Sequence, residues 1–268
     1  MQLTIVLGFP RSGTSLISNI LQNDVFYGGE PDQIRPLPED TFESDLVISV
    51  NEHVLGLLKI DWLNPEDVKK AVKIDWQDPA VRSRCQKYIV QAQVVVNSLI
   101  RQIKGKEGKV SIYWKDPRMS ILLPFWLQAI KSGTRDGVFD EPIEKINIIW
   151  CFRNPEESTD SAVDLFKNFN INKEQFSETW ELYNGFIAST LASTRLSFLM
   201  IHYADIIKSP KKVITQLFKF LGEDASKERV GAAVEIVNPE LYTYKSSKKK
   251  SLSNLYLRLI ELCSKQTF

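Results

Sequence analysis

The amino-acid sequence predicts an α/β protein in three layers, with a central parallel sheet and helices on both of its faces. Short apolar runs alternate with longer stretches of helical periodicity, which is the pattern of parallel strands joined by helices. Of the 268 residues, 43% are apolar, which is enough to build the core of a single domain. The sequence shows no internal repeat, so we expect one domain over residues 1–268.

The first expected strand is 3–8, an apolar run at the start of the chain. The second, 109–114, follows a break that contains glycine, and the third, 145–152, is rich in β-branched and aromatic residues. The fourth covers 197–203. Because helices separate these strands, they should lie parallel and be joined by right-handed crossovers.

Helices are expected between the strands and after the last one. The clearest is 79–104, which begins after Asp78 and stops before Gly105. The mostly helical stretch 30–108 should form a cap inserted over the sheet. The other expected helices cover 13–22, 43–58, 65–72, 119–131, 156–168, 173–194, 210–221, 226–236 and 252–264. Loops are expected at 24–42 and 132–142.

The first expected strand leads through a glycine-containing turn into a helix, a layout that binds phosphate at the helix N-terminus. The turn is Pro10-Arg11-Ser12-Gly13-Thr14-Ser15. Backbone N–H groups without helical partners and the helix dipole favour an anion there. Gly13 permits close approach of the backbone, and the Thr14 and Ser15 hydroxyls are donors. Arg11 adds a planar, permanently charged fork that suits phosphate or sulfonate oxygens.

The same turn nearly fits the G-x-x-x-x-G-K-[ST] loop of nucleoside triphosphate sites, with Gly8, Gly13 and Ser15 in place. Thr14, however, stands at the lysine position, and the cation is Arg11 inside the loop. The sequence also has no convincing strand that ends in an aspartate able to hold Mg²⁺. The loop therefore suits an anion better than a magnesium-bound triphosphate.

A second polar motif follows the expected strand 145–152. Arg153 stands at the carboxyl end of that strand, and Asn154-Pro155 form a turn that opens a helix. Ser161 lies eight residues after Arg153, in the second turn of that helix. Since ligands of open α/β sheets bind at the carboxyl ends of strands, both motifs should lie at the same edge.

Together these motifs resemble those of sulfotransferases that use 3′-phosphoadenosine-5′-phosphosulfate (PAPS). In that family the first loop reads Pro-[Lys/Arg]-Ser-Gly-Thr-[Thr/Ser] and binds the 5′-phosphosulfate, and an arginine and a serine spaced like Arg153 and Ser161 bind the 3′-phosphate. The resemblance implies a P-loop-like fold, PAPS as cofactor, adenosine 3′,5′-bisphosphate (PAP) as product and no metal. The cofactor-binding residues it implies are Arg11, Ser12, Gly13, Thr14, Ser15, Arg153 and Ser161.

Weaker similarities to bacterial sulfotransferases extend over most of the chain. They are Gly29-Glu30, Pro38 to Glu43, Asn51-Glu52, Trp114-Lys115-Asp116-Pro117-Arg118, His202 to Pro210, and Phe220-Leu221-Gly222. The resemblance thus implies a bacterial-type enzyme that moves a sulfuryl group to a hydroxyl or amine. The acceptor is expected to be a small molecule or a carbohydrate, with a lipid also open, in a pocket that the cap lines.

Sulfuryl transfer needs cations at the leaving phosphate and a base for the proton of the acceptor. Arg11 and Lys115, at the end of its strand, are the candidates for the cations. Animal cytosolic sulfotransferases place a histidine two residues after such a lysine, but here that residue is Pro117. Other branches use a glutamate after the first helix, which leaves Glu30 and Glu43 as alternative bases.

The balance of basic and acidic residues limits the kinds of partner that the chain is expected to bind. The chain has 34 basic and 33 acidic residues, a net charge of +1, which argues against a nucleic-acid partner bound through a broad basic field. Three separate cysteines predict free thiols and a reducing compartment. The sequence has no apolar run long enough to span a membrane and opens without a signal peptide, so a soluble, cytoplasmic protein is expected.

Two other functions fit part of the pattern. A P-loop kinase-like phosphotransferase would share the strand–turn–helix layout, although the loop lysine is missing. A non-catalytic module that binds adenosine bisphosphate would keep Arg11 and Arg153 but lack a working base.

Overall fold

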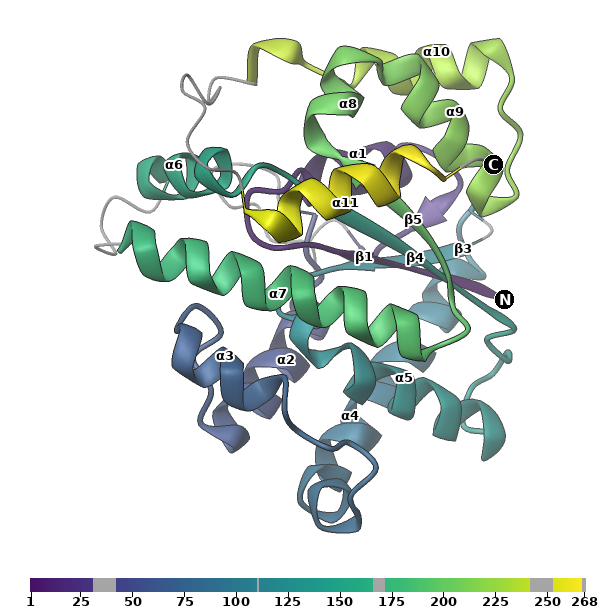
Figure 1. The fold of residues 1–268 in the computed structure, drawn as a ribbon. Helices are drawn as coiled ribbons and strands as arrows, with labels where there is room; N and C mark the ends of the chain where they lie inside the picture. Colours follow the sequence, from purple (N-terminus) through teal and green to yellow (C-terminus); the bar gives the residue numbers. More distant parts are fainter. Residues whose placement is uncertain (31–41, 110, 166–171, 242–252, 267–268) are drawn as a thin grey trace.

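The computed structural model describes residues 1–30, 42–109, 111–165, 172–241 and 253–266. Its strands form one sheet in the order β2-β3-β1-β4-β5, with every neighbouring pair parallel. Helices cover both faces of this sheet (Figure 1). The predicted three-layer α/β fold with a central parallel sheet is confirmed. The strands are β1 (Gln2–Leu7), β2 (Phe26–Tyr27), β3 (Ser111–Lys115), β4 (Lys145–Phe152) and β5 (Ser197–His202).

The predicted helices are present within the described residues, with small shifts at their ends. They are α1 (Thr14–Gln22), α2 (Asp45–Leu58), α3 (Pro65–Ala71), α4 (Pro79–Ile103), α5 (Met119–Arg135), α6 (Pro155–Leu165), α7 (Lys173–Ser193), α9 (Pro210–Leu221), α10 (Lys227–Glu235) and α11 (Asn254–Ser264). A short 3₁₀ turn covers Pro239–Leu241. Of the regions expected as loop, helix or strand, residues 31–41, 110, 166–168 and 252 lie outside the described residues.

Three local predictions were wrong. The expected loop 24–42 contains the short strand β2, and the expected strand 197–203 ends at His202, where α8 (Tyr203–Lys208) begins. Helix α5 continues to Arg135, through the start of the expected loop 132–142. Gly133 there does not break the helix; a Cβ atom on it would lie 2.4 Å from the Phe139 ring, so the glycine serves close packing.

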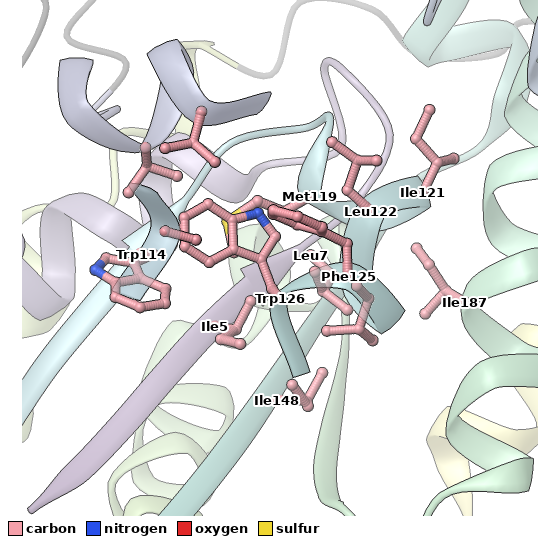
Figure 2. Close-up of a cluster of buried hydrophobic side chains, with 14 of the residues drawn as sticks. Ile5, Leu7, Trp114, Met119, Ile121, Leu122, Phe125, Trp126, Ile148 and Ile187 are labelled. Atoms are coloured by element: carbon pink, nitrogen blue, oxygen red, sulfur yellow. The ribbon is translucent and has the colours of Figure 1, made fainter. Parts of the chain in front are cut away.

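Alternation along β1 divides the core between the two faces of the sheet. Leu3, Ile5 and Leu7 point to one face, where α5 and α7 pack and α2 and α4 lie beyond (Figure 1). Figure 2 shows this cluster, with Trp126 of α5 above Ile5. Val6 points to the other face, which α1, α8, α9 and α10 cover. Burial on both faces explains why the strands are mostly apolar.

The β5 edge of the sheet is closed by a side chain. The Gln266 side-chain carbonyl accepts a hydrogen bond from the Met200 N–H at 2.7 Å, and its amide donates to the Phe198 carbonyl at 3.3 Å. Helix α11 carries Gln266 to this position beside β5 (Figure 1). Among the described residues the three cysteines are free thiols. No described helix combines the length and apolar character that crossing a bilayer requires.

Candidate active site

The two predicted motifs lie at one edge of the sheet. Strands β1 and β4 are paired in parallel from Gln2–Lys145 to Leu7–Trp150, so their carboxyl ends are neighbours. The first loop leaves the end of β1 and enters α1, and the second leaves the end of β4 and enters α6. Strand β3 ends with Lys115 on the other side of β1. This is the edge at which parallel α/β sheets bind ligands.

The first loop has the backbone of an anion cradle. Arg11 (φ 67°) and Gly13 (φ 91°) both adopt left-handed conformations, and α1 begins at Thr14 with no acidic residue in its first turn. Left-handed residues at such a turn bring successive N–H groups to one side, where they form a concavity for an anion. Ser12 is 1% exposed, and its hydroxyl has no hydrogen-bond partner within the described structure.

A direct contact joins the two motifs. The Arg11 Nε donates a hydrogen bond to the Ser161 Oγ at 2.9 Å, across 150 positions of sequence. Ser161 is buried on α6, so the contact fixes the arginine side chain toward the second motif. Both motifs therefore face one shared site, as the sequence spacing predicts.

Arg153 is buried at the end of β4 between two partners. Its Nε donates to Glu157 Oε2 at 3.1 Å, and its guanidinium carbon lies 4.6 Å from the centre of the Tyr203 ring. The same tyrosine packs on the first loop, because a Cβ atom on Gly13 would lie 2.4 Å from Tyr203 Cδ2. Tyr203 thus contacts both the first loop and Arg153.

The sequence pattern alone gives Tyr203 no role. Its segment resembles the bacterial enzymes, but the pattern places the tyrosine at the end of a strand. The structure makes it the first residue of α8, directly after β5. An aromatic residue at the carboxyl end of a fourth parallel strand was the available signal.

Lys115 connects the first loop with the segment that precedes α2. Its side chain is 2% exposed, and its ammonium group donates to Glu43 Oε1 at 2.7 Å and to Ser15 Oγ at 3.3 Å. Ser15 belongs to the first turn of α1, and Glu43 directly precedes the segment that enters α2. Of the two glutamates predicted as alternative bases, Glu43 therefore lies beside the loop.

A buried polar network supports this corner. Asp116, fully buried, accepts from Arg118 Nε at 2.8 Å and from Asn51 Nδ2 at 2.8 Å. Asn51 in turn accepts from the Trp126 indole at 2.7 Å, and Arg118 donates to Glu52 at 3.0 Å. An Arg118 Nη atom also lies 3.9 Å from Glu43. The network ties α2 and α5 to the end of β3 and holds Arg118 in place.

Glu30 has different partners. Its carboxylate accepts from the Tyr27 hydroxyl at 2.9 Å and pairs with Lys106 at 2.8 Å, beside the end of α4. The hydrogen bond from Lys106 lowers the pKa of Glu30, with a further contribution from Tyr27. No described contact joins Glu30 to Arg11 or Lys115.

The two histidines of the chain have other partners. The His202 ring shares a hydrogen bond with the Tyr256 hydroxyl at 2.9 Å and lies 3.5 Å from Asp205. His53 stacks on Tyr88. Within the ranges that the structure covers, no group of three or more His, Cys, Asp and Glu side chains is arranged to hold a metal ion.

Comparison with known proteins identifies the family. The family model described as "Sulfotransferase family" matches residues 4–227, which is most of the chain. The chain belongs to the sulfotransferase family. A comparison with curated proteins gives no match.

Solved structures agree with the fold of this sulfotransferase. It is similar to the sulfotransferase domain of the Synechococcus PCC 7002 olefin synthase, with 20% identity and a TM-score of 0.54, over 100% of this chain and 96% of that one. It is also similar to a sulfotransferase domain from the curacin biosynthetic pathway, with 17% identity and a TM-score of 0.50, over 100% and 99% of the two chains. At these identities the similarity establishes the α/β fold.

The close packing at Gly13 leads to a testable prediction about stability. Gly13→Ala places a side chain in a left-handed conformation and against Tyr203, so we expect it to destabilise the protein by about 2–4 kcal/mol. Thermal unfolding measures the change. Gly56→Ala is the control, because a Cβ atom on this helical glycine has no neighbour within 4 Å, and it should leave stability unchanged or raise it. Equal effects of the two substitutions would contradict the close packing of Tyr203 on the loop.

Proposed function

We propose that this sulfotransferase transfers a sulfuryl group from PAPS to a hydroxyl or amine of a small-molecule or carbohydrate acceptor. The observation that carries the proposal is the hydrogen bond from Arg11 to Ser161, because it joins two anion-binding motifs in one site. An adenosine with phosphate groups at both its 3′ and 5′ positions has the two anionic ends that such a pair would bind. The family supports sulfuryl transfer in general, and PAPS is the specific donor proposed here.

The residues present fit this donor. The loop of residues 11–15, with the unpartnered Ser12 hydroxyl and the close backbone approach at Gly13, would hold the 5′-phosphosulfate. Arg153 and Ser161 would hold the 3′-phosphate. When bound, PAPS supplies an activated sulfuryl group with a phosphate as leaving group. Fixed cations then neutralise the charge that develops, with Arg11 directed to the phosphate and Lys115 to the sulfonate oxygens.

We infer that Glu43 is the general base. It is buried in contact with Lys115, which itself contacts Ser15 of the loop, so its carboxylate is near the proposed sulfonate position. There it would accept the proton of the acceptor hydroxyl. Glu30 suits the role less well, because its hydrogen bonds to Lys106 and Tyr27 lower its pKa and weaken it as a base.

The proposed catalytic unit is a single domain over residues 1–268, with 30–108 as a cap that lines the acceptor pocket. Support comes from contacts between the cap and the end of β3, in which Glu43, Asn51 and Glu52 meet the Lys115–Arg118 segment. Trp62 faces this region, with its ring 5.3 Å from the Arg118 guanidinium. Trp76 and Trp114 are both buried.

Calorimetric titration tests the donor. We expect PAP to bind and Mg-ATP to bind at least roughly 100-fold more weakly, since the loop has no lysine for the β- and γ-phosphates. Tighter binding of Mg-ATP would favour the kinase-like alternative. Mass spectrometry of acceptor mixtures incubated with PAPS then separates an enzyme, which adds one sulfuryl group to an acceptor, from a non-catalytic module, which adds none.

A further inference from the structure

We propose that Lys115 is a positioning residue that makes the strength of the Glu43 base depend on the bound donor. The sulfonate of the bound donor would form an ion pair with Lys115 in place of Glu43. Glu43 would then be able to accept the proton of the acceptor. This inference rests on the proposed function and goes beyond it, because it couples two binding events through one side chain.

The geometry places Lys115 between two acceptors that compete for it. Its buried ammonium contacts Glu43 at 2.7 Å on the cap side and Ser15 at 3.3 Å on the loop side. Ser15 stands in the first turn of α1, where the helix dipole and the N–H groups favour an anion. An anion at the loop would therefore meet an ammonium group that already neutralises a carboxylate. At close range in a buried site, such competition is strong.

Lys115 is the closest cation to Glu43 among its described contacts, at 2.7 Å. Arg118 is its other charged neighbour, at 3.9 Å. The Arg118 guanidinium already forms ion pairs with Asp116 at 2.8 Å and with Glu52 at 3.0 Å. Breaking either ion pair would cost free energy. Loss of the Lys115 contact would leave the buried Glu43 carboxylate without its closest described cation and beside a sulfonate of like charge.

The transfer step balances without a further reagent. The O–H bond of the acceptor breaks and its proton moves to a Glu43 carboxylate oxygen. A bond forms between that acceptor oxygen and sulfur, while the bond from sulfur to the phosphate oxygen breaks with its electron pair leaving on PAP. The coupling thus strengthens the base when a sulfonate is present to be transferred.

Proton uptake on binding tests the coupling directly. Calorimetric titrations in buffers of different ionisation enthalpy give the protons taken up when PAPS binds to the wild-type chain and to Glu43→Gln. The variant should fold, because a glutamine side chain keeps an oxygen acceptor for Lys115. We expect wild type to take up more protons than Glu43→Gln when PAPS binds. PAP, which lacks the sulfonate, should give a smaller difference.

Two further variants test whether Lys115 causes the difference in proton uptake. Lys115→Met should abolish the difference that depends on Glu43, because no ion pair remains to be exchanged. Lys106→Met is the matched control, since it removes the partner of Glu30 instead, and it should leave the difference unchanged. Equal proton uptake by wild type and Glu43→Gln, with PAPS bound by both, would overturn the coupling while the proposed function stands. Failure of PAPS and PAP to bind to wild type would overturn both.

Discussion

Glu43→Gln is expected to lower kcat by roughly 10²–10⁴-fold, the range usually lost with a general base. Glutamine keeps the size of the side chain and can still accept a hydrogen bond from Lys115, but it cannot take a proton. Affinity for PAP should therefore change little. Steady-state rates of wild type and variant check this prediction.

Glu30→Gln is the matched comparison for that experiment. Glu30 is the other glutamate that the sequence offered, and it pairs with Lys106 instead of Lys115. Its replacement should leave kcat within a few-fold of wild type. A large loss in Glu30→Gln together with near-normal turnover in Glu43→Gln would reverse the assignment of the base.

Arg153→Ala should weaken PAP binding by roughly 10- to 100-fold while it leaves adenosine 5′-monophosphate binding nearly unchanged. Hydrogen bonds to a charged group are worth about 1.5–3 kcal/mol, and the proposed 3′-phosphate contact is lost only with the bisphosphate. Parallel calorimetric titrations of the two nucleotides measure the ratio. Equal losses for both would remove Arg153 from the 3′-phosphate site.

Two further variants test whether the loss of PAP affinity in Arg153→Ala is an indirect effect. Arg153→Lys keeps a positive charge beside Glu157, so it should fold, but without the planar fork it should still bind PAP less tightly than wild type. Arg135→Ala removes an equal charge from the exposed end of α5, where the arginine pairs with the neighbouring Asp136. It should bind both nucleotides like wild type, which excludes a general effect of net charge.

The sequence predicts most of the fold and both anion motifs because the signals are local. Apolar runs mark the strands, and residues that directly follow a parallel strand must lie at one edge of the sheet. That rule places both motifs at one edge of the sheet, where the Arg11–Ser161 contact spans 150 positions of sequence. The short strand β2 lacked such a signal, since its two residues pair with β3 only through the tertiary fold.

Other features depend on packing that a local pattern does not encode. Glu30 and Glu43 were equivalent candidates in the sequence, and only the folded chain separates the partner of Lys106 from that of Lys115. The role of Gly133 likewise depends on where Phe139 lies. Tyr203 was missed because its contacts, Gly13 and Arg153, come from two other segments.

Gln266 gives the outermost strand a partner made from a side chain. Edge strands expose backbone groups that invite pairing with strands of other molecules. Here one primary amide mimics a peptide group and satisfies both the Met200 N–H and the Phe198 carbonyl. A strand of another molecule would have to displace this amide before it could pair with β5. The Gln266 side chain therefore protects this edge of the sheet against intermolecular strand pairing.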